Sequence, residues 1–516
     1  MIRIFILIGR IWGFFVIGPI LRVIFWRRKH IPKAENPLLD YAAVDLATKI
    51  RNREITSQRL VQAYITRIKE VNPIINAVVD ERFAKAFLEA DAIDQLISQT
   101  DDTSLFALTK PFLGVPFTVK ENIGVEGMTQ GVGVVSRRDI RCTSDGASIK
   151  LLREAGAIPL CVGNTPEFSL NLECYNHITG RSLNPYDTRR TCGGSTGGDA
   201  ALVGAGASLF AIGSDIAGSI RLPALNNGIF GLKPTPGLIS YENYYPIVND
   251  PNFNKFFSVG ILARYANDMK SIFKVILANK INELNLDKEI QLNKLRVYYA
   301  EEFDNDFKLN PVDQEIKEIV LKTVKYLETQ GSAVFKLEEH LENLKFALEI
   351  GTTALTGICD PQVLECNGKQ KNIGIEYVKS LFGCSDHSIG MLQFEIMRRN
   401  RGFIRKSKLQ RWMELGCKME FDVMNLLDDN AIIVCPTFCK PALYHYELTH
   451  HGSGASYLLL ANAFGLPAIH IPITFHKGTG LPIGVQVIAG PKQDHICIEI
   501  ARILEMKFGG WKPPEN

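Results

Sequence analysis

The sequence predicts an α/β protein built on a large mixed, mostly parallel central sheet with helices on both faces. Amphipathic helical patterns alternate along the chain with short buried runs rich in β-branched residues, which is typical of such folds. With 46% hydrophobic and 22% charged residues, the 516 residues can bury a large core. No Gly- or Ser-rich linker and no repeat of fixed period interrupts residues 40–516. We therefore expect residues 40–516 to form one domain.

The first element is a predicted membrane anchor within residues 1–30. Residues 4–26 are almost all apolar, interrupted by Arg10 and Arg22. As one helix they would extend about 34 Å, enough to cross a bilayer core of roughly 30 Å. A charge inside such a span costs about 3 kcal/mol, so a helix lying in the membrane interface is the alternative. A cleaved signal peptide is disfavoured because bulky and then basic residues end the run.

Charge and cysteine content restrict the partners and the compartment. The basic cluster Arg27–Lys29 follows the apolar run and, by the positive-inside rule, predicts a cytosolic domain held at an intracellular membrane by a single-pass anchor. Residues 31–39 are the linker. The net charge is only +3 and the basic residues are mostly scattered along the chain, so the sequence gives no reason to expect a nucleic-acid partner. The 11 cysteines contain no C-x-x-C pair and predict mostly reduced thiols.

Local patterns predict the elements of the domain in chain order. A helix begins near Ser57, carries apolar residues at helical spacing and stops at Asn72-Pro73. The more polar region 265–430 is expected to be helical elaboration that shapes access to the site. The other expected elements are a strand ending near Lys120, a helix and strand within 145–162, a helix at 200–206, and strands at 209–213, 430–438 and 481–490.

A glycine-rich stretch from Gly193 to Arg221 carries serines near both ends, Ser195 and Ser219, and no histidine. A phosphate-binding Walker loop is disfavoured because Asp-Ala, and not Lys followed by Ser or Thr, comes after its last glycine pair. The alternative is a purely structural role, in which the glycines only allow tight turns. The small residues from Asp215 to Ser219 favour a functional site, because their consecutive N–H groups can point at one oxyanion.

The pattern G-x-S-x-G around Ser195 also fits the nucleophile elbow of α/β-hydrolases. An elbow lies between a strand and a helix, and residues 184–194 do not have a strand pattern. A histidine triad is therefore the weaker interpretation. The cluster of His445, His450 and His451 is expected to lie in a polar loop without metal. The later acids and histidines that would serve such a triad are Asp428, Asp429, His445, His450, His451 and His470.

At this point a family resemblance is evident. The stretch "GGSTGGDAALVGAGASLFAIGSDIAGSIRLPALNNGIFGLKPTPG" resembles the signature of the amidase signature hydrolases, and "FLGVPFTVKENIG" resembles the strand that carries their catalytic lysine. "SVGILARYANDM" and "GLPAIHIPI...GLPIGVQVIAG" extend the resemblance over residues 40–516. The apolar start, "GRSLNPYDTRR" and the ending "GPKQDHICIEIARILEMKFGGW" are most similar to the type-2 fatty-acid amide hydrolase group. The resemblance implies the amidase-signature fold.

The resemblance also implies a role for each site residue. Ser219 is the expected acyl nucleophile, Ser195 the bridging serine after a cis Gly194–Ser195 bond, and Lys120 the base. Lysine is a poor base at its ordinary pKa of about 10.4, but burial at the end of an apolar strand lowers that pKa. This Ser-Ser-Lys arrangement replaces the histidine triad. The expected oxyanion hole is formed by the backbone N–H groups of Ile216, Ala217, Gly218 and Ser219.

Two positions depart from the family pattern. Thr196 stands where the family usually has a second serine, and Ala217 stands where glycine is usual in the oxyanion loop. A Cβ at position 217 is tolerable only where φ is negative. The resemblance gives Asp215 and Arg221 the supporting role of holding the loop.

The predicted function is that of a membrane-associated serine hydrolase that cleaves long-chain fatty-acid amides to fatty acid and amine through an acyl-enzyme. Its expected partners are the lipid amide and the membrane, no cofactor or metal is implied, and a homodimer stays open. One alternative is an amidase for other small amides, or a subunit that produces ammonia for an amidotransferase. Another is an inactive membrane-bound lipid-binding protein.

Overall fold

The computed structural model describes residues 2–12, 15, 18–248, 250–358, 365, 366 and 369–515. Its central feature is an eleven-stranded sheet. The strands of this sheet are β1 (Val78–Glu81), β2 (Pro116–Lys120), β3 (Ile158–Gly163), β6 (Phe210–Asp215), β7 (Phe230–Lys233), β8 (Ser258–Ala263), β9 (Arg296–Tyr299), β10 (Ala333–Lys336), β13 (Ala431–Pro436), β14 (Ala468–Phe475) and β15 (Pro482–Ala489). Two small ladders join β4 (Tyr175–Asn176) to β5 (Gly180–Arg181) and β11 (Glu365–Cys366) to β12 (Lys369–Gln370).

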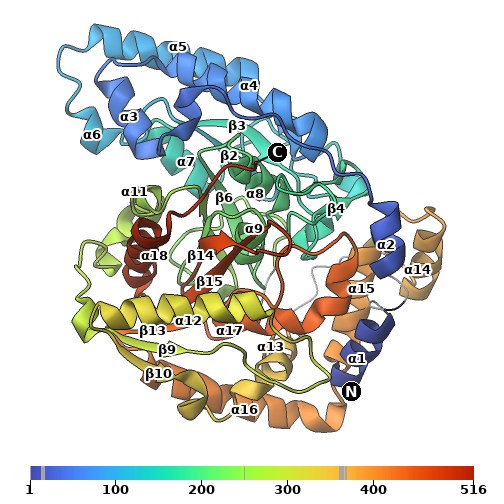
Figure 1. The fold of residues 1–516 in the computed structure, drawn as a ribbon. Coiled ribbons are helices and arrows are strands. Elements are labelled where there is room, and N and C mark those ends of the chain that lie inside the picture. The colour runs from blue at the N-terminus through green and yellow to red at the C-terminus, as the bar shows by residue number, and fades with distance from the viewer. Residues whose placement is uncertain are drawn as a thin grey trace.

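Helices cover both faces of the sheet (Figure 1). They are α1 (Ile2–Trp12), α2 (Gly18–Ile24), α3 (Ala43–Arg51), α4 (Ser57–Ile75), α5 (Phe83–Gln99), α6 (Phe106–Thr109), α7 (Ala147–Glu154), α8 (Gly197–Gly204), α9 (Arg221–Asn226), α10 (Pro251–Phe256), α11 (Ala266–Leu277), α12 (Gln314–Thr329), α13 (Ala347–Thr356), α14 (Ile373–Leu381), α15 (Ile389–Arg399), α16 (Lys406–Leu426), α17 (Ala455–Ala463) and α18 (Asp494–Phe508). The α/β architecture with a large mixed sheet is therefore confirmed.

The expectation of a mostly parallel sheet is wrong. The order is β1-β3-β2-β6-β8-β7-β14-β15-β13-β9-β10. Among the described residues, four neighbouring pairs are parallel (β2–β3, β2–β6, β13–β9, β10–β9) and the other six are antiparallel. The reason lies in the middle of the sheet, where β14 and β15 form a hairpin and β8 lies between β6 and β7. Alternation of helices and strands in the sequence does not reveal which strands become neighbours.

The parallel trio β3-β2-β6 positions the end of β2. In the β2–β3 register Lys120 is opposite Gly163, and in the β2–β6 register Thr118 is opposite Ala211. All residues of β2, β3 and β6 are buried. Because buried strands surround the end of β2, the Lys120 side chain is enclosed and does not reach solvent.

Several predicted elements are displaced at their ends. Thr56 caps α4 by accepting a hydrogen bond from the N–H of Arg59, and the helix continues through Pro73 until Asn76, which adopts the left-handed conformation. Helix α8 begins and ends a few residues before the predicted range. Region 265–430 is largely helical as expected, but it also supplies β9 and β10 at one edge of the main sheet.

The amino-terminal apolar run forms two short helices, α1 and α2, in the described residues. Residues 13, 14, 16 and 17 of the predicted span lie outside the described residues. In the parts of the chain that the structure describes, no helix is both long and apolar enough to cross a membrane. Pro19 stands in the first turn of α2, where a missing N–H is tolerated.

Candidate active site

Lys120 is the centre of the candidate site. Its side chain is fully buried at the end of β2. The ammonium nitrogen donates to Ser195 Oγ at 2.7 Å and to Ser214 Oγ at 3.0 Å, with the Ser214 carbonyl at 3.5 Å. Burial lowers the pKa of Lys120 from its ordinary value to about 7, although Asp199 and Asp215 oppose this shift by charge. The neutral amine, which can act as a base, is therefore well populated near neutral pH.

Ser195 lies in the loop that leads into α8. The Gly194–Ser195 peptide bond is cis, as the resemblance implies, and the Ser195 side chain is almost fully buried. Gly194 must be glycine, because a Cβ there would lie 2.6 Å from the carbonyl oxygen of Asn171. The close approach of the chain at Asn171 therefore explains the glycine at position 194.

Ser219 is brought beside Ser195 by the backbone. The N–H of Thr196 donates to the carbonyl oxygen of Ser219 at 3.1 Å. In the described residues no hydrogen bond joins the two serine hydroxyls. Lys120 thus contacts Ser195 directly. Ser219 is bonded, through its carbonyl oxygen, to Thr196, the residue that follows Ser195.

The loop before Ser219 presents three backbone N–H groups without a partner. Within the described residues the amides of Ile216, Ala217 and Ser219 make no hydrogen bond. The amide of Gly218 differs from the expectation, because it donates to Asp215 Oδ1 at 2.7 Å. Its φ of +96° turns it toward that carboxylate, whereas Ala217 avoids the left-handed region and is tolerated. An oxyanion hole here therefore has three available donors.

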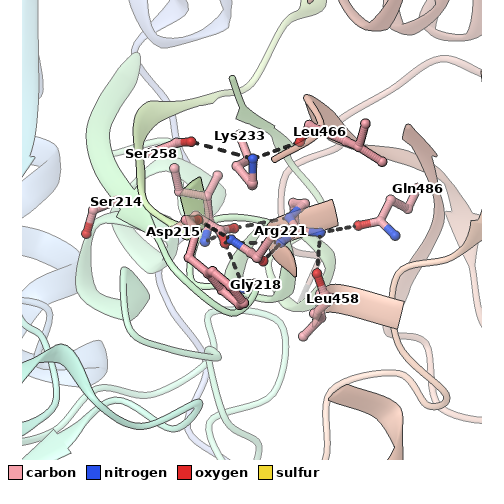
Figure 2. Close-up of polar contacts among 12 residues, drawn as sticks. Ser214, Asp215, Gly218, Arg221, Lys233, Ser258, Leu458, Leu466 and Gln486 are labelled. Carbon is pink, nitrogen blue, oxygen red and sulfur yellow. Dashed lines mark hydrogen bonds and ion pairs between the residues drawn. The ribbon is translucent and has the colours of Figure 1, made fainter. Parts of the chain in front are cut away.

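Asp215 and Arg221 form a fully buried ion pair at 3.1 Å that holds this loop (Figure 2). The carboxylate of Asp215 also accepts from the N–H groups of Gly218 and Ile220. Arg221 donates further to the Leu458 carbonyl at 3.0 Å and to Gln486 Oε1 at 2.6 Å. The Arg221 guanidinium keeps the pKa of Asp215 well below its usual range despite burial. The loop is thus tied to β15 and α17.

Thr196 fits because of a glycine on the neighbouring strand. A Cβ at Gly213 would lie 2.6 Å from the Thr196 methyl carbon Cγ2. The Thr196 hydroxyl lies 3.4 Å from the Ser214 carbonyl oxygen, to which it donates. The methyl group that distinguishes Thr196 from serine is accommodated in the space that Gly213 leaves free.

Sequence reasoning missed three polar residues around Lys120. Ser214 accepts from Lys120, and Asn122 Nδ2 donates to both Ser214 Oγ and Ser169 Oγ at 3.1 Å. All three are buried. The available signal was proximity in the chain, because Asn122 follows Lys120 by two residues and Ser214 precedes Asp215.

No histidine completes a triad in the described part of the chain. His445 lies in a turn, is fully buried and contacts Glu173 and the Thr188 carbonyl. His470 contacts Thr437. Asp428 pairs with Arg296. Neither Ser195 nor Ser219 bonds to a histidine, and the segment before Ser195 is no strand of the sheet. The described residues also hold no group of three His, Cys, Asp or Glu side chains suited to a metal.

The α/β fold and the buried Lys120–Ser195 contact beside a loop with three free N–H groups are compatible with an acyl-transfer enzyme that works without histidine. A sequence model described as Amidase matches residues 59–498. The chain therefore belongs to the amidase signature family, and it is an amide-hydrolysing enzyme.

Relatives of known name match almost the whole chain. Fatty-acid amide hydrolase 2-B of Danio rerio is 36% identical over 509 residues, covering 95% of this chain and 93% of the relative. Fatty-acid amide hydrolase 2 of Homo sapiens is 34% identical over 486 residues, covering 93% and 91%. The indoleacetamide hydrolase of Bradyrhizobium diazoefficiens is 27% identical over 491 residues, covering 92% and 88%.

Solved structures share the fold at lower identity. A 6-aminohexanoate cyclic dimer hydrolase complexed with substrate superposes with a TM-score of 0.73 and 23% identity, covering 93% of this chain and 99% of the other. A structure named fatty acid amide hydrolase gives a TM-score of 0.68 and 19% identity, covering 92% and 87%. These similarities establish the amidase-signature fold.

Proposed function

We propose that this chain is a serine amidase that cleaves long-chain fatty-acid amides to fatty acid and amine at a membrane surface. The observation that carries the proposal is the buried 2.7 Å contact between Lys120 and Ser195. The next residue, Thr196, is hydrogen-bonded to Ser219. The substrate class is supported by the relatives named fatty-acid amide hydrolase 2, which match the chain over more than nine-tenths of its length.

The first half of the reaction forms an acyl-enzyme. Neutral Lys120 accepts the Ser195 proton, and Ser195 accepts the Ser219 proton as Ser219 Oγ bonds to the amide carbon. The carbonyl electrons move to its oxygen, which the free N–H groups of Ile216, Ala217 and Ser219 stabilise. When the intermediate collapses, the C–N bond breaks and the amine leaves with the proton that Lys120 returns through Ser195.

Water completes the cycle by the same relay. Water gives a proton to Ser195, which passes its own proton to neutral Lys120, while the water oxygen bonds to the acyl carbon. The intermediate then collapses, the ester bond to Ser219 breaks, and Ser219 Oγ regains a proton from Lys120 through Ser195. The products are the fatty acid and free Ser219. The relay needs the two serine hydroxyls to approach when substrate binds, a tightening that is common in serine hydrolases.

Membrane association is supported by the outward faces of α1 and α2. The arginines of α1 point to the protein: Arg3 pairs with Asp304 and Glu349 at 2.6 Å, and Arg10 donates to the carbonyl of Phe307 at 2.8 Å. No charge of α1 needs to enter lipid, and Arg22 of α2 lies over the Tyr444 ring, so both helices can lie in the interface. The exposed apolar side chains are Ile4, Phe5, Ile8, Ile11, Trp12, Ile20, Val23, Ile24 and Trp26.

Release of free fatty acid from a long-chain primary amide tests the function. Membranes carrying the wild type are expected to release it, and membranes carrying Ser219→Ala are expected to release none. Turnover of short polar amides alone would contradict the substrate class and favour the small-amide alternative. Activity that survives in Ser219→Ala would contradict the nucleophile.

Cosedimentation with lipid vesicles tests the membrane surface. The double variant Ile8→Asp/Val23→Asp is expected to lose most vesicle binding, because it places charges on the outward faces of α1 and α2. The matched control is Leu108→Asp on α6, where the side chain is 84% exposed but lies on another element. Equal binding of all three proteins would contradict association through these helices.

A further inference from the structure

A second buried charge lies behind the candidate base. Asp199 stands in the first turn of α8, four residues after Ser195, and its side chain is fully buried. Within the described residues neither of its carboxyl oxygens has a partner at full hydrogen-bond geometry, and the hydroxyl of Thr118 beside it has none either. Among the described side chains, the Asp199 carboxyl and the Thr118 hydroxyl therefore have only each other as polar neighbours at hydrogen-bonding range, which is uncommon for a buried carboxyl.

The sheet register brings this carboxyl to Lys120. Gly163 is opposite Lys120 in the parallel β2–β3 pair, so a side chain at position 163 would project from the same face as the lysine. That space is filled by Asp199, because a Cβ at Gly163 would overlap its carboxyl group. Thr118 is two residues before Lys120 on β2 and shares this face. Because Gly163 has no side chain, the Asp199 carboxyl group fits into this space.

The two groups affect each other by charge. Burial raises the pKa of Asp199 to about 7, and the Thr118 hydroxyl and the ammonium of Lys120 act in the opposite direction. The Asp199 charge in turn raises the pKa of Lys120, as the charges of Asp215 and Cys174 do. Cys161 is opposite Thr118 in the same β2–β3 register; burial, and then the charge of Asp199, raise the pKa of its thiol. The charge of each group therefore shifts the pKa of the other.

We propose that Asp199 is a positioning residue of this active site, whose buried carboxyl decides by its charge how much of Lys120 is present as neutral base. An ionised Asp199 stabilises the ammonium and withholds the base, and a protonated Asp199 releases it. The inference rests on the proposed function of Lys120, because it assigns the control of that residue's proton.

The test is the pH dependence of Ser219 labelling by an alkyl fluorophosphonate, which needs no knowledge of the substrate. In Asp199→Asn the charge is lost while the shape is kept. The midpoint of the acid limb of the labelling rate is expected to fall by about one pH unit, the size of a nearby-charge effect. A purely structural role would lower the rate by the same factor at every pH and leave the midpoint in place, which would overturn the inference.

Two further variants complete the test. Glu505→Gln is the matched control, since Glu505 is a carboxyl on α18 whose pKa burial also raises to about 7 but which contacts Ala266; its midpoint is expected to stay at the wild-type value. Thr118→Val removes the hydroxyl beside Asp199 at constant shape, disfavours the ionised carboxyl and is expected to lower the midpoint by less. If Asp199→Asn does not fold, an unmoved midpoint in Thr118→Val overturns the inference. A wild type that is not labelled at any pH would instead overturn the proposed function.

Discussion

The backbone N–H of Thr196 donates to the carbonyl oxygen of Ser219 at 3.1 Å. This one bond joins the loop of the proposed bridging serine to the loop of the proposed nucleophile. Because Lys120 contacts Ser195, the proposed base, proton carrier and nucleophile come together from the end of β2, the loop before α8 and the loop between β6 and α9.

The activity of the wild type is expected to depend on neutral Lys120. Since burial lowers the pKa of Lys120 to about 7, kcat/KM should rise with pH through that value and be lost below it as the amine is protonated. Lys233 is also buried with a pKa lowered to about 7, but it donates to the Leu466 carbonyl at 2.7 Å (Figure 2), and in the described residues no hydrogen bond joins it to Ser195 or Ser219. We expect Lys120→Met to lose activity at every pH and Lys233→Met, where folded, to keep the acid limb. An acid limb that disappears with Lys233 alone would contradict the assignment.

Gly213 and Thr196 are expected to be coupled in stability. Gly213→Ala introduces a Cβ against the Thr196 methyl group, and overpacking of this kind costs about 1–3 kcal/mol. In the double variant Thr196→Ser/Gly213→Ala the methyl group is gone, so part of that loss should return. Urea unfolding of the two single variants and the double variant measures the coupling. Strict additivity would show that the two side chains do not compete for the same space.

Breaking the Asp215–Arg221 pair is expected to be strongly destabilising. Asp215→Asn leaves the buried Arg221 without its counter-charge, and removal of one partner of a buried pair costs about 3–5 kcal/mol. The comparison is Glu342→Gln, which removes an ion pair with Lys418 at the surface and should change the unfolding free energy by less than about 1 kcal/mol. Similar unfolding curves for the two variants would contradict the role given to the buried pair.

The two small residues of the oxyanion loop should respond differently to substitution. Gly218 has a φ of +96°, and an added Cβ would meet the side chain of Leu458 at 2.5 Å, so Gly218→Ala should reduce kcat by more than about tenfold. Ala217→Gly should change kcat by less than about threefold, because alanine is unstrained there. Steady-state kinetics of both variants decide the point. Equal losses would indicate that loop flexibility, and not the φ of Gly218, controls the rate.

Much of the candidate site follows from the sequence because its residues lie in two contiguous motifs. The family resemblance indicates Lys120, Ser195 and Ser219 by position, although Lys120 and Ser195 are 75 residues apart. The motif does not reveal Ser214 or Asn122 as contacts of this network, and it does not reveal that the Gly218 amide already donates to Asp215. Such facts depend on rotamers and on a φ angle, which residue types alone do not specify.

The fold was predictable in its class and not in its strand directions. Short buried runs such as residues 158–162 are recognisable as strands, but their partners depend on contacts across the whole chain. The four-residue strands β9 and β10 are missed because β10 is a largely exposed edge and β9 is too short to show a period. At the amino terminus, the apolar composition alone predicts a single span, whereas the described residues there contribute the helices α1 and α2.

Ser219 is the residue proposed to form the covalent bond to the acyl group. Peptide mass spectrometry of the wild type after reaction with an alkyl fluorophosphonate tests this role, with Ser219→Ala and Ser195→Ala treated in parallel. We predict a single adduct on Ser219 in the wild type, none in Ser219→Ala and slow labelling of Ser219 in Ser195→Ala. An adduct on Ser195, or a wild type that carries no adduct at all, would contradict the account.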